Sequence, residues 1–559
     1  MTAGGAWVPV LVGGAILVPM LLALLEVARP GRVGGWLATA PLPALLAGVL
    51  LATGSGVDAP WLLFGARLGL DDTGRLLLSA SAAIWLAAAL YAVGAGMRPG
   101  TRSGFLLAMA GNFGVVLAQD AASFFTCYAL MSFAAYLLVV ERGDAAAHRA
   151  GRVYVALVVL GEVLVLSGLL HAAAGSTATL WAMPLAGLLL WVGFGIKTGL
   201  VPLHFGLPLA YGAASTAGAI ALAGAMVNAG LLGWLRFLPV GDPGAAGLGL
   251  AMIGFGLAGA FYGVLVGLTQ TDARTLLGYS SASQMGLIAV GVGAGLVAPA
   301  SWPVLLGAVL LFAVHHAFAK AALFAGLGLS EGSRSRLRHL ALLVPALALV
   351  GLPFTSGELA KAALKAALPA LPGAWADALA LALPLATLGT TLLMARLLFI
   401  ATARPPDSVA RAPSAAGAAI LLAAVLAAAW WLPGVVPAGV GVARPAALGG
   451  LLPALAGALI AAAAWLLDRS GKLAPRVRLP AGDLLVPLER LAGVLWRAAA
   501  PVPEAHHPAE PEPPSAAPPP GRLPALLARG EGVLTRWEVA GVALLALAVL
   551  VSLLILAGS

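Results

Sequence analysis

Charged residues are scarce in this sequence, where they make up 9% of 559 residues. Soluble domains average about 25% charged residues, so this chain lacks the polar surface that contact with water requires. The single cysteine, Cys127, excludes an intrachain disulfide and any iron–sulfur or zinc site made wholly of cysteine. No basic stretch precedes the first apolar run, so no cleavable signal peptide is expected. No residue pattern indicates a catalytic, metal-ligating or cofactor-binding site, and none is expected.

Apolar residues are abundant instead: they make up 61% of the chain, and the mean hydropathy is +1.00. They form runs such as 8–26 and 539–558, each long enough to cross about 30 Å of hydrocarbon at about 1.5 Å per residue. The sequence therefore predicts an all-α, polytopic membrane bundle of about 15–16 transmembrane helices. They are predicted near 7–27, 34–53, 74–97, 103–119, 122–140, 150–172, 180–201, 214–236, 246–268, 275–296, 303–328, 338–367 (broken), 378–400, 414–433, 447–467 and 538–557.

The net charge of +9 comes from arginines and lysines near helix ends, which is typical of topology signals rather than nucleic-acid binding. The first fifteen helices are numbered in order, and a connection is called odd or even after the helix that it follows. The odd connections, together with the residues after helix fifteen, hold 17 lysines and arginines. The even connections hold 4, namely Arg67, Arg75, Arg236 and Arg444. Because positive residues stay on the cytoplasmic side, the chain is predicted to be a multi-pass protein of a bacterial inner (plasma) membrane with its N-terminus in the periplasm.

The sequence changes character after the fifteenth helix. A leucine stripe in 483–499 predicts an amphipathic helix along the membrane surface or against a partner. A Pro-rich linker at 501–524, predicted to be cytoplasmic, precedes the last helix. The predicted divisions are N-terminal helices 1–3 (1–100), a first five-helix repeat (101–240), a second (241–402), helices 14–15 (403–470), the amphipathic segment with its linker (471–536) and a C-terminal helix (537–559).

Ionisable side chains at membrane depth cost about 2.5–3.5 kcal/mol or more each, so each one is a candidate site. The sequence places Glu162, Lys197, His204, His315, His316, Lys320, Glu358, Lys361 and Lys365 there. Plainer interpretations stay open for some of them. A buried histidine can simply bond a neighbouring carbonyl, His204 can mark the end of a broken helix, and Glu358 and Lys365 can extend to an interface.

Two of the lysines lie beside predicted helix breaks. Lys197 precedes Pro202 in helix seven, and Lys361 follows Gly351 and Pro353 in helix twelve. Broken helices at mid-membrane present unpaired backbone groups that bind ions or water. A lysine there can gain and lose a proton, because burial disfavours its charged form. His316 and Lys320, four residues apart on helix eleven, are predicted to relay protons between the two lysines.

The chain also repeats itself weakly. The stretch 114–120, entering helix five, is similar to 263–272, entering helix ten. Each is followed two helices later by a helix with an interior lysine and a break. Helices 4–8 and 9–13 are therefore predicted to be two five-helix repeats, the second inverted because the number of spans is odd.

Four stretches resemble the antiporter-like membrane subunits of respiratory Complex I and of Mrp antiporters: 197–210, 270–286, 316–320 and 351–361. Residues 150–154 and 229–236 are most similar to the hydrogenase-4 and formate-hydrogenlyase type. The last helix and the surface segment before it resemble those of subunits with a lateral arm. The resemblance implies two half-channels joined by a polar axis of lysines and histidines, which passes protons across the membrane. It also implies coupling to redox chemistry in partner subunits.

The first half departs from the family pattern at three positions. Ala129 stands where a helix-five glutamate is usual, Asn228 where a helix-eight lysine is usual, and Tyr211 where a histidine is frequent. Lys197 therefore lacks its usual counter-ion, and Glu162 of the neighbouring helix is a candidate substitute.

Three functions remain open from the sequence. The first is a proton-translocating, partly degenerate subunit of a Complex I-like NADH-quinone oxidoreductase or membrane-bound hydrogenase, itself non-catalytic. The second is an Mrp-type cation/proton antiporter subunit, for which sodium is a possible second ion. The third is a structural or coupling subunit whose first half-channel does not conduct. Gene neighbours encoding iron–sulfur and hydrogenase or quinone-site subunits favour the first, and a cluster of small antiporter subunits favours the second.

Overall fold

The computed structural model describes residues 7–63, 65–175, 179–180, 183–329, 335–368, 371, 373–403, 412–436, 448–470 and 479–487. These residues all belong to one compact unit, Met1–Leu488. Most of the predicted surface helix, the Pro-rich linker and the predicted last transmembrane helix lie outside them.

The described residues are almost entirely helical. The helices are α1 (Trp7–Ala28), η1 (Gly34–Thr39), α2 (Leu42–Leu50), α3 (Asp72–Ala95), α4 (Pro99–Leu117), α5 (Ala121–Ala134), α6 (Tyr136–Val139), α7 (Ala145–Ala173), α8 (Leu185–Thr198), η2 (Leu203–Phe205), α9 (Gly206–Ala213), α10 (Thr216–Ile220), η3 (Ala221–Met226), α11 (Val227–Phe237), η4 (Pro243–Ala245), α12 (Ala246–Thr269), α13 (Ala273–Val297), η5 (Pro299–Ser301), α14 (Trp302–Gly328), α15 (Ser335–Val350), α16 (Ser356–Ala367), α17 (Trp375–Ala403), α18 (Ala412–Val435) and α19 (Leu448–Arg469). Two short antiparallel hairpins join helices: β1 (Gly56–Ala59) with β2 (Ala66–Gly69), and β3 (Thr179–Leu180) with β4 (Met183–Pro184).

The prediction of an all-α membrane bundle is confirmed. Within the described residues, twelve helices are long and apolar enough to cross a membrane. The helix over 99–117, the short pair η1 and α2, and the broken pair α15 and α16 occupy the other three positions predicted before residue 470. The second predicted helix, 34–53, differs most: it divides into η1 and α2, separated by Ala40 and Pro41.

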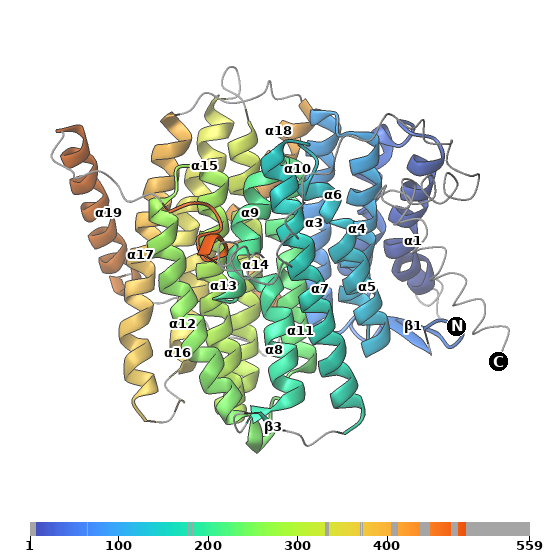
Figure 1. Cartoon of the computed structure of the whole chain (residues 1–559), viewed down its shortest axis with the longest axis horizontal. Coiled ribbons are helices and arrows are strands. Elements are labelled where there is room, and N and C mark those ends of the chain that lie inside the picture. The colour runs from blue at the N-terminus through green and yellow to red at the C-terminus, as the bar shows by residue number, and fades with distance from the viewer. Residues whose placement is uncertain are drawn as a thin grey trace, which may run out of the picture. The chain divides into compact units, whose positions relative to one another are not determined.

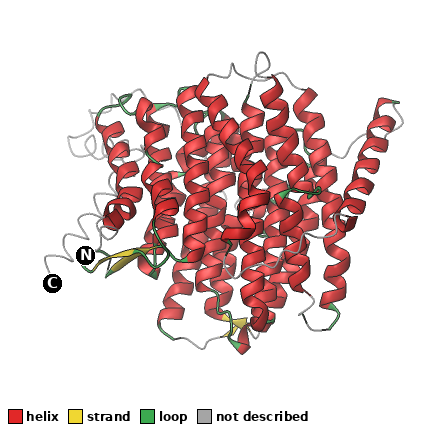
Figure 2. Ribbon diagram, turned by 180° about the vertical axis from the view of Figure 1, so that it is seen from behind, coloured by secondary structure: helices red, strands yellow, loops and turns green. Residues whose placement is uncertain are grey.

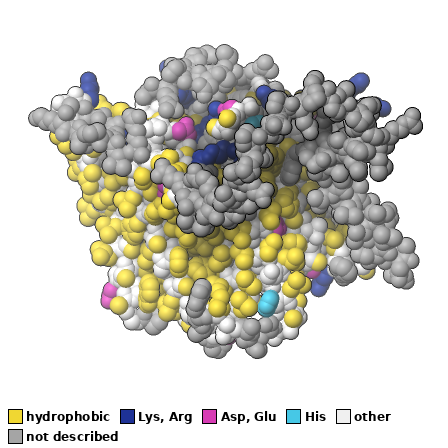
Figure 3. Space-filling view, in the orientation of Figure 1, with side chains coloured by type: hydrophobic (Ala, Val, Ile, Leu, Met, Phe, Trp, Pro, Cys, Tyr) yellow, Lys and Arg dark blue, Asp and Glu magenta, His cyan; other side chains and the backbone are white. Residues whose placement is uncertain are grey.

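The helices stand side by side, with α1 at one edge of the unit and α19 at the other (Figures 1 and 2). The helices α13 and α14 lie inside the unit. In their most apolar 18-residue stretches, 94% and 89% of the residues are buried, against 22% for α1 and 11% for α19. Figure 3 shows hydrophobic side chains over the middle of the viewed face, as a lipid-facing surface requires.

Both predicted helix breaks are present. The first ends α8 at Gly199, whose φ of +84° is the left-handed conformation that glycine adopts most readily, and α9 begins after Pro202 and η2. The second ends α15 at Gly351 (φ +87°), and α16 begins at Ser356 with Thr355 as its N-cap. A third irregularity was not predicted: η3, between α10 and α11, is a π-helical stretch, a feature that is frequent at functional sites.

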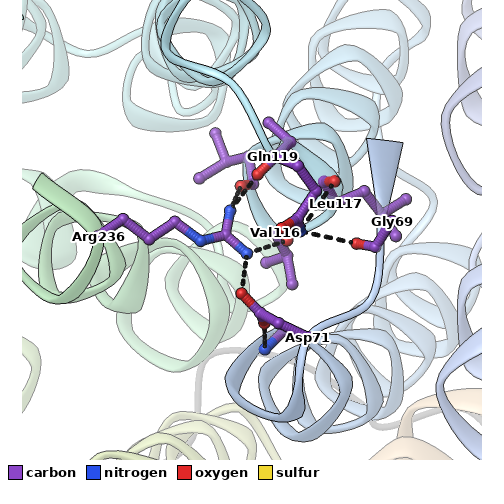
Figure 4. A network of polar contacts seen from close by, with 9 residues as sticks. Gly69, Asp71, Val116, Leu117, Gln119 and Arg236 are labelled. Atoms are coloured by element: carbon purple, nitrogen blue, oxygen red, sulfur yellow. Dashed lines mark hydrogen bonds and ion pairs between the residues drawn. The ribbon is translucent and has the colours of Figure 1, made fainter. Parts of the chain in front are cut away.

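Ion pairs join distant helices at their ends. Arg236, in the last turn of α11, donates to the carbonyl oxygens of Val115, Val116 and Ala118 at the end of α4, and to Asp71 (Figure 4). Asp71 caps the start of α3, so one guanidinium connects three helices. Near the end of α1, Glu26 is 1% exposed and pairs with Arg102 of α4 at 3.1 Å. Because an unpaired charge is costly to bury, each pair restricts how its helices can move.

Candidate functional site

A small cavity lies beside Lys197, at the end of α8. It has a volume of about 50 Å³ and lies between α5, α7, α8, α9 and the stretch from η3 to α11. Since one water needs about 10–15 Å³, it has room for more than one water molecule. The Lys197 ammonium donates to the Tyr154 hydroxyl at 3.5 Å and lies 5.5 Å from the centre of the Tyr128 ring.

Glu162 of α7 lines the same cavity. It is 7% exposed, and neither carboxylate oxygen makes a hydrogen bond of ordinary geometry within the described chain. Lys197 and Ser132 line this cavity beside the carboxylate. The structure therefore brings together the lysine and the carboxylate that the sequence paired as a candidate ion pair.

The positions that depart from the family pattern carry no charge into this cavity. The Tyr211 hydroxyl, where a histidine is frequent, donates to the Leu222 carbonyl of η3 at 3.4 Å and lines the cavity. The Asn228 amide donates to the Gly224 carbonyl at 3.5 Å. Ala129 of α5 offers only a methyl group.

His204 lies in η2, within the helix break that follows Lys197, and is completely buried. Its Nε2 lies 3.4 Å from Oδ1 of Asp483, a residue that sequence analysis did not single out. The Asp483 carboxylate also accepts hydrogen bonds from the hydroxyls of Tyr262 and Tyr279, the second at 2.9 Å. Burial raises the pKa of the Asp483 carboxyl, but the nearby His204 imidazole and the hydrogen bonds from Tyr262 and Tyr279 outweigh burial and hold its pKa below the ordinary value.

Asp483 could not have been paired with His204 from the sequence. It stands at the start of the predicted surface helix, where an acidic residue is normally solvated. The one signal is its isolation, because it is the only acidic residue among the described residues after α19.

The three titratable residues of α14 are buried at the centre of the unit. The His315 Nδ1 lies 2.8 Å from the Ser356 hydroxyl, at the start of α16. Lys320 donates to the Leu277 carbonyl of α13 at 3.2 Å. His316, one turn before Lys320, is completely buried, and neither ring nitrogen has a hydrogen-bond partner in the described part of the protein. The helix α14 therefore offers groups toward both α13 and α16.

Lys361 lies beside the second helix break. Its ammonium donates to the carbonyl oxygens of Leu349 and Val350, each at 2.9 Å. Glu358 accepts from the backbone N–H of Phe354, and its own N–H donates to the Thr355 hydroxyl, so it takes part in capping α16. Lys365, one turn further along α16, is exposed.

Further polar side chains lie on α13, between the two groups of titratable residues. The Ser280 and Ser281 hydroxyls and the Gln284 carbonyl oxygen are buried without a hydrogen-bond partner among the described residues. The Gln284 amide donates to the Thr390 hydroxyl of α17 at 3.1 Å. Since buried polar groups are nearly always hydrogen-bonded to protein or to water, water is the remaining partner for these atoms.

The predicted site residues thus occupy a row that crosses the unit from α7 to α16. Glu162 and Lys197 share a cavity, His204 adjoins the break after them, Lys320 contacts α13, and His315 and Lys361 adjoin the second break. The lysine, imidazole and carboxylate groups of this row are all titratable.

Known proteins share this sequence pattern. The family model described as "NADH:quinone oxidoreductase/Mrp antiporter, TM" matches residues 118–400, which include both helix breaks and the row of titratable residues. An uncharacterised protein of Mycobacterium tuberculosis is 31% identical over 311 residues, which cover 51% of this chain and 48% of that protein. Hydrogenase-4 component B of Escherichia coli is 28% identical over 235 residues, which cover 38% of this chain and 35% of that one. The matched stretch thus spans about half the length of these relatives or less.

A solved structure shares the fold. One chain in the structure of the Mrp complex from Dietzia sp. DQ12-45-1b aligns with a TM-score of 0.69 and 21% identity, over 95% of this chain and 66% of that chain. At this identity, the likeness concerns the arrangement of helices alone.

Proposed function

Because the chain belongs to the NADH:quinone oxidoreductase/Mrp antiporter transmembrane family, we propose that it moves protons across the membrane as a subunit of a larger complex. The route runs along the row from Glu162 and Lys197 to Lys361. The observation that carries the proposal is the burial of lysines and histidines at and between two broken helices. Such groups are costly at membrane depth and are therefore rare there without a function such as ion movement, and broken helices supply the polar surroundings that they need.

The two end lysines have different partners. Lys197 shares its cavity with the Glu162 carboxylate, so a proton on either group changes the charge that the other one meets. Lys361 is bound by carbonyl oxygens at the end of α15, where the helix dipole attracts a cation. Between them, an imidazole such as His316 can take a proton on one nitrogen while it releases one from the other.

The orientation of the chain in the membrane and its coupling to partner subunits complete the proposal. The excess of lysine and arginine in the odd connections favours a cytoplasmic position for those loops and a periplasmic N-terminus. The resemblance to hydrogenase-4 component B supports coupling to redox chemistry in partner subunits. The family also includes Mrp antiporters, which keeps the alternative of cation/proton exchange, in which sodium moves against protons.

Isolation of the native complex tests the proposal. A tag on the chain recovers its companions, which mass spectrometry identifies, and the complex is reconstituted into vesicles with a pH-sensitive dye. Proton uptake is then measured twice, once driven by the electron donor that the companions use and once by an imposed sodium gradient. Uptake with the donor supports the redox-linked function, and uptake with sodium alone supports the antiporter. No uptake in either assay contradicts proton transport and leaves a structural role.

A further inference from the structure

The segment 479–487 lies against the bundle at the first helix break (orange-red, in front of α9 and α13 in Figure 1). Leu484 and Leu485 pack against a small cluster that includes Leu157 and Ile196. Leu157 and Ile196 also line the Lys197 cavity, so the segment supports two walls of that cavity.

Asp483 is held by three separate elements. Its partners are His204 of η2, Tyr262 of α12 and Tyr279 of α13. The side chain is only 5% exposed. Leucines at 484 and 485 attach the segment at no electrostatic cost, whereas a buried carboxylate needs partners to offset its lost hydration. An attachment role alone therefore does not account for an aspartate at this position.

His204 and Asp483 lie near each other but make no hydrogen bond, so proton exchange between them needs a small approach of the two groups or one bridging water. The Nε2 and Oδ1 atoms lie 3.4 Å apart. When the imidazole is protonated, its Nε2–H bond can break as an O–H bond forms on Asp483, and both groups become neutral; the reverse step restores both charges. The other ring nitrogen, Nδ1, has no hydrogen-bond partner among the described residues, so it can exchange a proton on its own side.

The cluster also adjoins the second half of the protein. Tyr279 donates to Asp483, and the carbonyl of Leu277, two residues earlier on α13, accepts from Lys320. Asp483 and Lys320 therefore contact the same turn of α13.

We propose that Asp483 is a proton-transfer residue that the C-terminal segment contributes to the route, and that it exchanges a proton with His204 between the Lys197 cavity and Lys320. This inference rests on the proposed function, since it adds a residue to the same route. It also makes the segment after α19 part of the conducting machinery rather than only a brace.

The test uses the native complex in membrane vesicles, with proton transport measured against pH and complex content measured in parallel. Asp483→Asn keeps one acceptor oxygen, and with it one of the two tyrosine hydrogen bonds, but cannot take up a proton at ordinary pH. We expect it to assemble normally and to lose transport by roughly 100-fold, the scale of a lost acid–base group. Asp483→Glu restores a carboxyl group and is expected to recover much of the activity with an altered pH profile.

Leu485→Ala is the matched control, because it weakens packing of the same segment without changing charge. Unchanged transport in Asp483→Asn, or an equal loss in Leu485→Ala and Asp483→Asn, overturns the inference. If Asp483→Asn does not assemble, Asp483→Glu decides: a pH profile identical to that of the natural protein overturns it.

Lys361→Ala separates this inference from the proposed function. Active Asp483→Asn beside inactive Lys361→Ala refutes only the role of Asp483. Full activity in both variants contradicts the proton route itself.

Discussion

The ammonium nitrogen of Lys361 lies 2.9 Å from the carbonyl oxygen of Val350, the last residue of α15. The lysine belongs to α16, so a side chain of one half-helix donates hydrogen bonds to the unpaired carbonyls at the end of the other. The unpaired carbonyls at a helix C-terminus carry about half a negative charge and stabilise a cation there. A proton that leaves Lys361 must therefore overcome this attraction, which makes the second break a place where proton release can be controlled.

Replacement of this lysine tests its role directly. We expect Lys361→Ala to abolish proton transport while the complex still assembles, because the route loses its last titratable group. Transport in vesicles and complex content measure the two effects. Lys365→Ala, on the same helix but exposed, is the control and should transport normally. Normal transport in Lys361→Ala removes this residue from the route.

The Ser356 hydroxyl should orient His315. Ser356→Ala removes the partner 2.8 Å from Nδ1 but leaves Lys361 and its carbonyl partners in place. The net value of such a hydrogen bond is about 1 kcal/mol, so we expect transport to fall about fivefold and Ser356→Thr to restore it. Equal rates for Ser356→Ala and the natural protein contradict this role.

Glu162 should act as the counter-ion of Lys197. If it replaces the missing charge at Ala129, Glu162→Gln and Lys197→Ala should reduce transport to a similar extent, since either change leaves the cavity with one partner of the pair. The Ala129→Glu change in the Glu162→Gln background tests the exchange of positions and is expected to recover part of the activity. A silent Glu162→Gln indicates a first half that does not conduct.

The guanidinium of Arg236 should stabilise the fold rather than the transport route. Arg236→Ala leaves Asp71 and three carbonyl groups without their partner. Because Asp71 is 43% exposed, we expect a loss of about 2 kcal/mol, below the cost of breaking a fully buried pair. Arg67→Ala, whose pair with Asp58 is largely exposed, should cost less than about 1 kcal/mol. Apparent melting temperatures of the purified protein distinguish the two, and equal shifts contradict the assignment.

The parts of the fold that follow from local sequence were predictable. Long apolar runs fixed the number of helices before residue 470, and the glycines and prolines after Lys197 and before Lys361 marked both breaks. The family membership was also confirmed, because the family model matches residues 118–400, which include both breaks. The inverted repeat and the predicted divisions of the chain stay predictions.

Contacts between distant segments were not predictable. Asp483 reaches His204 only because a segment after α19 packs across the first break, and no periodicity in either stretch encodes that contact. The same holds for Arg236, whose position near a helix end suggested only a topology signal. The π-helical stretch η3 could not be predicted either, since its residues other than Gly224 are good formers of an ordinary α-helix.

Ordered water in the native complex provides the most direct test of the account. A high-resolution cryo-electron microscopy map should show water molecules beside Lys197 and Glu162, next to the buried hydroxyls of α13, and between His316 and Lys361. We predict a hydrogen-bonded file that joins these positions with no gap longer than one water. Continuous apolar packing between Lys197, His316 and Lys361, with no water density along the row, would contradict proton transport through this protein.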